Sequence, residues 1–230
     1  MSIRCYVAAN RIFVADVETG ASTEIAHNQA GGCQLTDFSA DGKWLVYTRR
    51  GEDLNSEVYL FEIEPRRELN LTDNPFSDMR GILTPDGKQL VFVSDRDNGI
   101  SHLFVVPLAR LAEDPDDPVV KERLKKARSA KKEASAASQP EAIVADAAGI
   151  DRRAQQLTRG ENGVGSYFLS ADGSTIYFIS TDERGRGMFS IGIDGQGPQA
   201  RHRRLRDRYR QLWADQRRQH PDAGLARGDL

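Results

Sequence analysis

The sequence predicts an all-β fold, a partial β-propeller of about three and a half four-stranded blades with a charged insertion in one blade and a basic C-terminal tail. A segment of about a dozen residues occurs three times, as "SADGKWLVYTRR", "TPDGKQLVFVSDR" and "SADGSTIYFISTDER". The Asp-Gly pairs in these segments begin at Asp41, Asp86 and Asp172, which are 45 and 86 residues apart. A period of 45 residues fits the first gap, and the same period with 41 extra residues fits the second.

Each period holds four strand-like stretches. The Asp-Gly pair supplies the positive φ angle that a tight hairpin needs, and an aromatic-rich strand follows it. A second strand comes next, and its aromatic residues align from one period to the next: Phe13, Tyr59, Phe104 and Phe189. A third strand ("STEIAHN", "RELNLTDN", "RAQQLTRGEN") and a short strand before each turn ("GCQLTDFS", "MRGILTP", "VGSYFLS") complete the period. Four short strands per 40–45 residues are typical of a propeller blade, so we expect Trp44 and Tyr47 to pack between blades.

The period gives the domain boundaries. We expect a partial propeller over residues 1–198, followed by an Arg-rich tail at 199–230. Its four blades are listed here in chain order: blade 1 without its first strand at about 3–30, blade 2 at 31–74, blade 3 at 75–159 with an insertion at 112–148, and a partial blade 4 at 160–198.

The blade text resembles the TolB-like, or PD40, propeller repeat, and more closely the propellers of tricorn proteases and tricorn-like serine peptidases. Three passages carry the resemblance: "EVYLFEIEPRRELNLTD", "LNLTDNPFSDMRGILTPDGKQLVFVSDRD" and "IVADAAGIDRRAQQL". The last one is similar to the segment with which bacterial members resume the blade after a charged insertion. The resemblance covers about residues 5–195 and implies an S41-type serine peptidase as the parent family.

The 230 residues contain no text that resembles the PDZ domain or the catalytic domain of those peptidases. We therefore expect no catalytic residue in this chain. The resemblance implies a different role, because the propeller of such peptidases is thought to gate or bind peptide on its way to the active site. We expect the peptide-binding residues at the blade loops: Arg49, Arg50, Asp95, Arg96 and Arg184.

Two segments depart from the repeat. The insertion is rich in Ala, Lys, Glu and Ser, and Val119 to Lys132 could form a solvated helix within it. The tail holds nine Arg and four Asp, a balance of +5 that leaves −7 for the rest of the chain. Three interpretations of the tail stay open: out-of-frame translation, an amphipathic helix that covers an open blade edge, or an RNA- or membrane-binding arm.

The remaining patterns argue against several classes of site. Cys5 and Cys33 form neither a disulfide framework nor a zinc site, and we expect both to be small buried side chains. No nucleophile elbow, metalloprotease or phosphate-binding motif occurs, so we expect no metal and no cofactor. The basic stretch in the insertion has acidic flanks and no aromatic residues, which argues against nucleic acid. No apolar run is long enough to span a membrane. The chain as written reads as cytoplasmic, or as periplasmic or secreted if an upstream signal peptide is missing.

The sequence therefore favours a non-catalytic propeller segment of a tricorn-like serine peptidase, with a peptide-gating, peptide-binding or scaffold role. The partners would be peptides or proteins. One alternative is a stand-alone TolB-like interaction module that closes its ring by self-association through open blade edges. A second alternative is a nonfunctional, truncated gene product.

Overall fold

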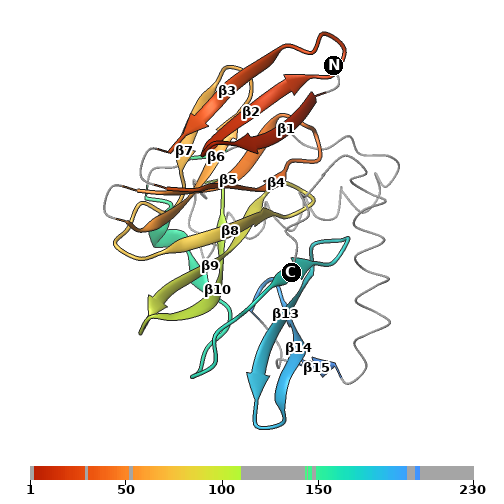
Figure 1. Cartoon of the computed structure of the whole chain (residues 1–230). Helices are drawn as coiled ribbons and strands as arrows, with labels where there is room; N and C mark the ends of the chain where they lie inside the picture. Colours follow the sequence, from red (N-terminus) through yellow and green to blue (C-terminus); the bar gives the residue numbers. More distant parts are fainter. Residues whose placement is uncertain are drawn as a thin grey trace, which may run out of the picture.

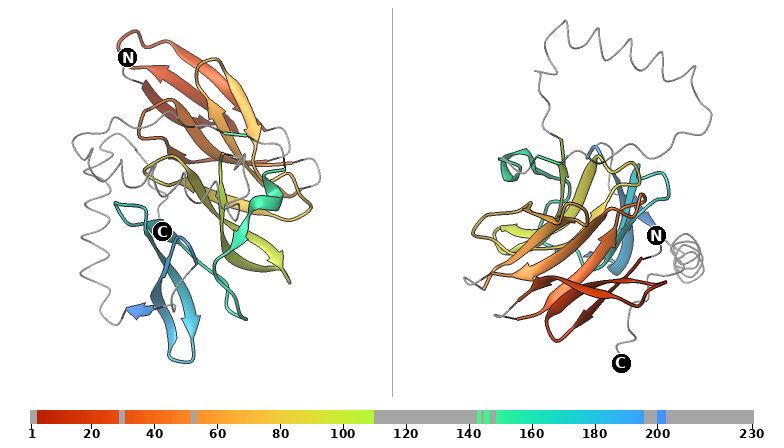
Figure 2. Two further views of the ribbon diagram at one scale, coloured as in Figure 1. Left: turned by 180° about the vertical axis from the view of Figure 1, so that it is seen from behind. Right: turned by 90° about the horizontal axis from the view of Figure 1, so that it is seen from above.

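The computed structural model describes residues 3–28, 31–51, 54–109, 143, 145–146, 149–195 and 200–202. Its strands form four antiparallel sheets, each built from strands that follow one another in chain order. The sheets succeed one another in an arc, from the red N-terminal sheet to the blue last sheet (Figures 1 and 2). The all-β, partial propeller fold predicted from the sequence is therefore confirmed. The expected helix within the insertion and nearly all of the Arg-rich tail lie outside the described residues.

Within the residues that the structure describes, the first blade has three strands and each of the others has four. The strands of the first and second blades are β1 (Ile3–Ala8), β2 (Arg11–Asp16), β3 (Ser22–His27), β4 (Cys33–Phe38), β5 (Trp44–Arg50), β6 (Ser56–Glu62) and β7 (Arg67–Asn70). Those of the third and fourth blades are β8 (Asp78–Leu83), β9 (Gln89–Asp97), β10 (Ile100–Pro107), β11 (Gln155–Gln156), β12 (Tyr167–Leu169), β13 (Thr175–Asp182), β14 (Gly185–Gly192) and β15 (Ala200–His202). A 3-10 helix, η1 (Asp151–Arg153), precedes β11. Strand β15 pairs with β14 beyond residue 198, where the sequence pattern places the end of the fourth blade.

The three Asp-Gly turns share one geometry. In each turn the glycine has a φ of 67–72° and its N–H donates to the carbonyl three residues earlier. The aspartate accepts both the hydroxyl of the residue two positions before it and the N–H two positions after it, as Asp41 does from Ser39 at 2.6 Å and Lys43 at 3.1 Å. Asp86 and Asp172 repeat these bonds. The repeated dozen residues therefore specify a preformed turn followed by a buried strand.

Three apolar clusters join successive blades. The first lies between blades 1 and 2, the second between blades 2 and 3, and the third between blades 3 and 4. Each blade stacks one aromatic pair across its central hairpin, and the pairs are Tyr6–Phe13, Tyr47–Tyr59, Phe92–Phe104 and Phe178–Phe189. In blades 2, 3 and 4 this pair packs against the preceding blade. Trp44 and Tyr47 are buried between blades, as predicted, whereas Cys33 is buried and Cys5 only half-buried.

The first strands of blades 2, 3 and 4 are also tied to one another. The Asp37 carboxylate accepts the Leu83 N–H at 2.7 Å, and burial raises the pKa of Asp37 to about 6. The Tyr167 hydroxyl of β12 donates to the Arg80 carbonyl of β8. Close packing adds a steric requirement at Gly81, where a Cβ atom would lie 2.6 Å from Val58 Cγ1. These contacts fix the inner strands of adjacent blades relative to each other.

Candidate functional site

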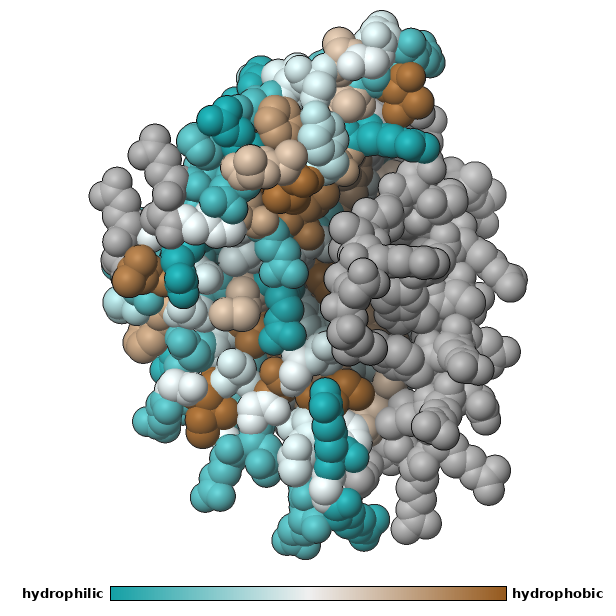
Figure 3. Space-filling model, in the orientation of Figure 1, coloured by the Kyte–Doolittle hydropathy of each residue, from teal (hydrophilic) through white to brown (hydrophobic). Residues whose placement is uncertain are grey.

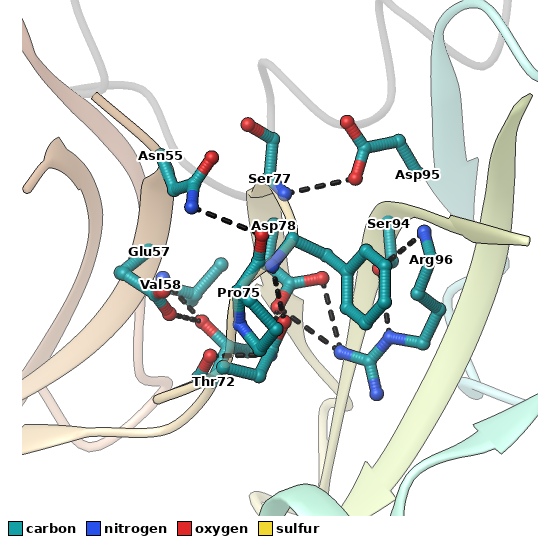
Figure 4. Close-up of polar contacts among 12 residues, drawn as sticks. Asn55, Glu57, Val58, Thr72, Pro75, Ser77, Asp78, Ser94, Asp95 and Arg96 are labelled. Carbon is teal, nitrogen blue, oxygen red and sulfur yellow. Dashed lines mark hydrogen bonds and ion pairs between the residues drawn. The ribbon is translucent and has the colours of Figure 1, made fainter. Parts of the chain in front are cut away.

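The candidate site is a polar cluster around the loop that leads from β7 to β8, between blades 2 and 3 (Figure 4). Thr72 lies near the start of this loop and is buried. Its hydroxyl oxygen accepts the Val58 N–H at 2.9 Å, and its proton is donated to Glu57 Oε2 at 2.6 Å. A single hydroxyl therefore satisfies a backbone group of β6 and a buried carboxyl group of the same strand.

Asp78 ends the loop and is fully buried at the start of β8. Arg96 Nη2 lies 3.0 Å from both carboxylate oxygens, and Asn74 Nδ2 donates to Oδ2 at 2.5 Å. Arg96 Nε donates to Ser94 Oγ at 2.8 Å, which sets the orientation of the guanidinium group (Figure 4). Burial raises the pKa of Asp78, although the Ser94 hydroxyl and the positive charge of Arg96 oppose this effect. The result is a buried ion pair with its remaining lone pairs largely satisfied.

The guanidinium group of Arg96 also lies over two rings of the third blade. Its central carbon is 4.7 Å from the Phe104 ring centroid and 5.4 Å from that of Phe92. These are cation–π distances, so the aromatic pair of blade 3 supports the same cation that binds Asp78.

Glu57 adds a second carboxyl group to the cluster. Burial is the main cause that raises its pKa to about 7, and the charges of Asp78 and Asp73 act in the same direction. A carboxyl group with such a pKa is partly protonated at neutral pH.

The cluster also holds the outer part of the loop in place, and we call this segment, residues 72–78, the clamped loop. Asn55 Nδ2 donates to the Pro75 carbonyl at 3.0 Å, the Ser77 N–H donates to Asp95 Oδ1 at 2.8 Å, and the Phe76 N–H donates to Asn74 Oδ1 at 2.9 Å. Phe76 is nevertheless 42% exposed, and Leu54 in the neighbouring hairpin turn is 61% exposed. The cluster thus fixes a loop beside which apolar side chains face outward.

A related arrangement joins blades 3 and 4. Thr158 Oγ1 accepts the Leu103 N–H at 2.9 Å and lies 3.3 Å from Nδ1 of the buried His102. His102 Nε2 is 3.7 Å from Asp97 Oδ2, which accepts a hydrogen bond from Gln156 Nε2 at 2.8 Å. His102 therefore stands at the repeat position that Glu57 occupies one blade earlier.

The predicted binding residues do not form one site. Asp95 and Arg96 both belong to the cluster between blades 2 and 3. Arg49 instead bonds Glu68 at 3.2 Å and lies over the Tyr59 ring at 4.2 Å, on the side of blade 2 that packs against blade 1. Arg50 is exposed at the end of β5, and Arg184 is exposed in the turn between β13 and β14. These residues share only their location, because each lies in or near the turn of the central hairpin of its blade.

Sequence reasoning missed Glu57, Thr72 and Asp78. A signal was present, because Leu-Thr occurs at the same place in two periods, in "NLTDN" and "QLTRG". Glu57 and His102 are also polar residues that stand one position before an apolar strand run. Within the ranges that the structure describes, no group of three or more His, Cys, Asp or Glu side chains is placed to hold a metal ion. No helix in those ranges is long and apolar enough to cross a membrane.

Comparison with known proteins identifies the fold. No family model matches the chain. The Tol-Pal system protein TolB of Wolinella succinogenes is 30% identical over 91 residues, which are 40% of this chain and 21% of that protein. A putative TolB from Agrobacterium tumefaciens superposes with a TM-score of 0.54 at 16% identity, over 83% of this chain and 55% of that one. TolB from Acinetobacter baumannii superposes with a TM-score of 0.55 at 19% identity, over 86% of this chain and 39% of that one. The fold is that of a TolB-like β-propeller.

The chain spans only part of these TolB proteins, between 21 and 55% of their length. In this TolB-like propeller, the clamped loop lies at the end of the blades where the central hairpins turn, beside the β5–β6 turn of blade 2 and the end of β9 in blade 3. It combines a backbone fixed by hydrogen bonds with exposed apolar side chains, which suits recognition of another polypeptide.

Proposed function

We propose that this chain is a non-catalytic propeller segment that binds peptides or proteins at the clamped loop between blades 2 and 3. The observation that carries the proposal is the exposure of Phe76 on a loop held by hydrogen bonds from Asn55 of blade 2 and to Asp95 of blade 3. An aromatic side chain on a rigid loop loses little conformational entropy on binding, and exposed aromatic residues are frequent energetic centres of interfaces. The relationship to a Tol-Pal system protein is consistent with a protein partner.

We propose further that the parent protein is a tricorn-like serine peptidase whose propeller gates or positions peptide. This finer assignment rests on the sequence resemblance, above all on "GIDRR" at Gly149 to Arg153 after the charged insertion. Sequencing the gene with its flanks tests it. Coding sequence for a PDZ domain and a protease domain, either in frame with the blades or brought into frame by one frameshift, supports the peptidase parent. Flanks without such text favour the stand-alone TolB-like module.

The binding proposal is tested by selecting peptides against the full chain from a phage-displayed library. The selected peptides are then titrated against Phe76→Asp and against Val17→Asp, a matched control in the first blade that is 47% exposed. Phe76→Asp should weaken binding by about tenfold or more, and Val17→Asp should leave it unchanged. Equal affinity for both variants would overturn the proposed location. Stoichiometric labelling of the chain by a serine-reactive fluorophosphonate would overturn the non-catalytic assignment.

A further inference from the structure

Arg80 stands at a place in its blade where the neighbouring blades have an apolar or aromatic residue. It lies in β8, in a bulge opposite Phe92, and the equivalent places of blades 2 and 4 hold Leu35 and Tyr167. Its backbone φ of 58° is in the left-handed region, which residues with a side chain rarely adopt. Bulges re-aim side chains and are frequent beside functional sites. A strained backbone thus places a cation where blades 2 and 4 have none.

The surroundings of Arg80 come from blades 2, 3 and 4. Its N–H donates to Thr48 Oγ1 of blade 2 at 3.1 Å, and its side chain reaches blade 4, where Nη1 donates to the Gly165 carbonyl. The Tyr167 hydroxyl of blade 4 donates to the Arg80 carbonyl. Four-stranded blades therefore lie on both sides of this residue, and it is half-buried between them.

The guanidinium group of Arg80 is only partly satisfied. Nε is buried without a hydrogen-bond partner, and the described residues provide no acceptor for Nη2. These two atoms form one edge of the guanidinium fork, which can bind two oxygen atoms at once. Arg96 shows the contrast, because its Nη2 lies 3.0 Å from both carboxylate oxygens of Asp78. Among the described residues, Arg80 has no such counterion.

Burial without a counterion is unfavourable for a cation. It lowers the pKa of Arg80, and only Tyr167 acts in the opposite direction. Removing water from a charged group costs free energy unless a counterion and hydrogen bonds take its place. An anionic ligand at the edge formed by Nε and Nη2 would supply both.

We propose that Arg80 binds the carboxylate group of a small ligand at the Nε–Nη2 edge of its guanidinium group. A carboxylate is planar, presents two oxygens that match this edge, and carries the single negative charge that one guanidinium group balances. Asp37 is near enough to raise the pKa of Tyr167, and Arg80 is near enough to lower it. A second negative charge on the ligand would therefore meet repulsion from Asp37. The face of the molecule in Figure 3 is largely polar with small hydrophobic areas, which fits a small charged ligand better than a large apolar one.

The binding test is an NMR titration of the full, ¹⁵N-labelled chain with sodium acetate, with sodium chloride at equal ionic strength as the reference. The readout is the Nε–Hε signal of Arg80, assigned from its loss in Arg80→Lys. Acetate should shift this signal along a saturating curve that chloride does not produce. Arg66 is the matched control, because it is an exposed arginine with a φ of 68°, and its signal should respond equally to both salts. The amide signal of Gly165 should follow the same curve, with affinity at least about tenfold weaker in Arg80→Asn.

Equal responses of Arg80 to acetate and chloride, or an unchanged curve at Gly165 in Arg80→Asn, would overturn the proposal. A saturating curve with inorganic phosphate and none with acetate would overturn the choice of a carboxylate. Without ligand, Arg80→Asn should unfold at a temperature no lower than the wild type, because asparagine tolerates a positive φ and leaves no buried cation. A lower Tm would assign the guanidinium group to the stability of the fold instead. Phe76→Asp should leave the acetate curve unchanged, so this inference and the peptide-binding proposal can fail separately.

Discussion

Thr72 and Thr158 stand at the same position of successive blades, and each accepts a backbone N–H of its own blade at 2.9 Å, from Val58 and Leu103 respectively. Both hydroxyl groups are buried, and both also contact a buried titratable side chain, Glu57 in one blade and His102 in the other. The hydrogen bond from the backbone N–H to the threonine hydroxyl is therefore the same in both blades, whereas the second side chain that the hydroxyl contacts differs between them.

Thr72→Val and Thr158→Val should each destabilise the fold by about 1–3 kcal/mol. The replacement keeps the shape and removes the hydroxyl, so a buried N–H is left without its partner. In a domain of this size we expect a fall in Tm of about 2–4 °C for each kcal/mol, measured by calorimetry. Thr23→Val on the exposed part of β3 is the matched control and should change Tm very little. Equal shifts for all three variants would contradict the buried role.

Asp78→Ala should be more damaging than removal of an exposed acidic partner. Asp78 is fully buried and its partner Arg96 is 18% exposed, and loss of one member leaves a charge without its counterion, at a cost of about 3–5 kcal/mol. Glu62→Ala breaks the more exposed pair with Arg67 and should cost less than about 1 kcal/mol.

The double variant Asp78→Ala with Arg96→Met provides the control for this prediction. If the unpaired charge causes the damage, the double variant should unfold at a higher temperature than Asp78→Ala alone. Additive effects of the two substitutions in chemical or thermal unfolding would show that the pair is not energetically coupled.

Gly81→Ala should destabilise the contact between blades 2 and 3 by about 1–3 kcal/mol. The added Cβ would lie 2.6 Å from Val58 Cγ1 and 2.9 Å from Val46 Cγ1, both in a closely packed cluster. Gly32→Ala is the control, because an added Cβ there would meet no described heavy atom within 4 Å and its φ is not in the left-handed region. Val58→Ala combined with Gly81→Ala should recover part of the lost Tm, and a further fall would contradict the steric cause.

Much of the fold was predictable because its signals are local. An Asp-Gly pair specifies a turn through its own side chain and φ angle, and the aligned aromatic residues mark the pairs that stack across each hairpin. The expected strand in "RAQQLTRGEN" forms only over Gln155–Gln156. Strand β15 lies in an Arg-rich part of the sequence that shows no alternation of apolar and polar residues. These outer strands are defined by their neighbours more than by their own sequence.

The polar cluster was less predictable because its partners are distant in sequence. Asp78 and Arg96 are 18 residues apart, and Glu57 and Thr72 are 15 apart. Neither pair forms a recognised motif, and the bonds exist only because the strands and blades pack together. Of the predicted residues, Asp95 and Arg96 belong to the cluster because they lie near the end of β9, beside the loop. Arg49 instead lies on the side of blade 2 that packs against blade 1.

The titration of Glu57 gives a prediction for pH dependence. Its pKa is raised from 4.5 to about 7 in the folded chain, so the fold favours the protonated carboxyl group. The stability that this group contributes is fully present below pH 4.5 and is lost as pH rises through 7. Glu57→Gln removes the titration and keeps a polar side chain beside Thr72. The Tm of Glu57→Gln minus that of the wild type should therefore increase between pH 4.5 and 7 and then level off. The increase should correspond to about 1–3 kcal/mol. A difference in Tm that stays constant over this range in calorimetric scans would show that Glu57 ionises as easily in the folded chain as in the unfolded one.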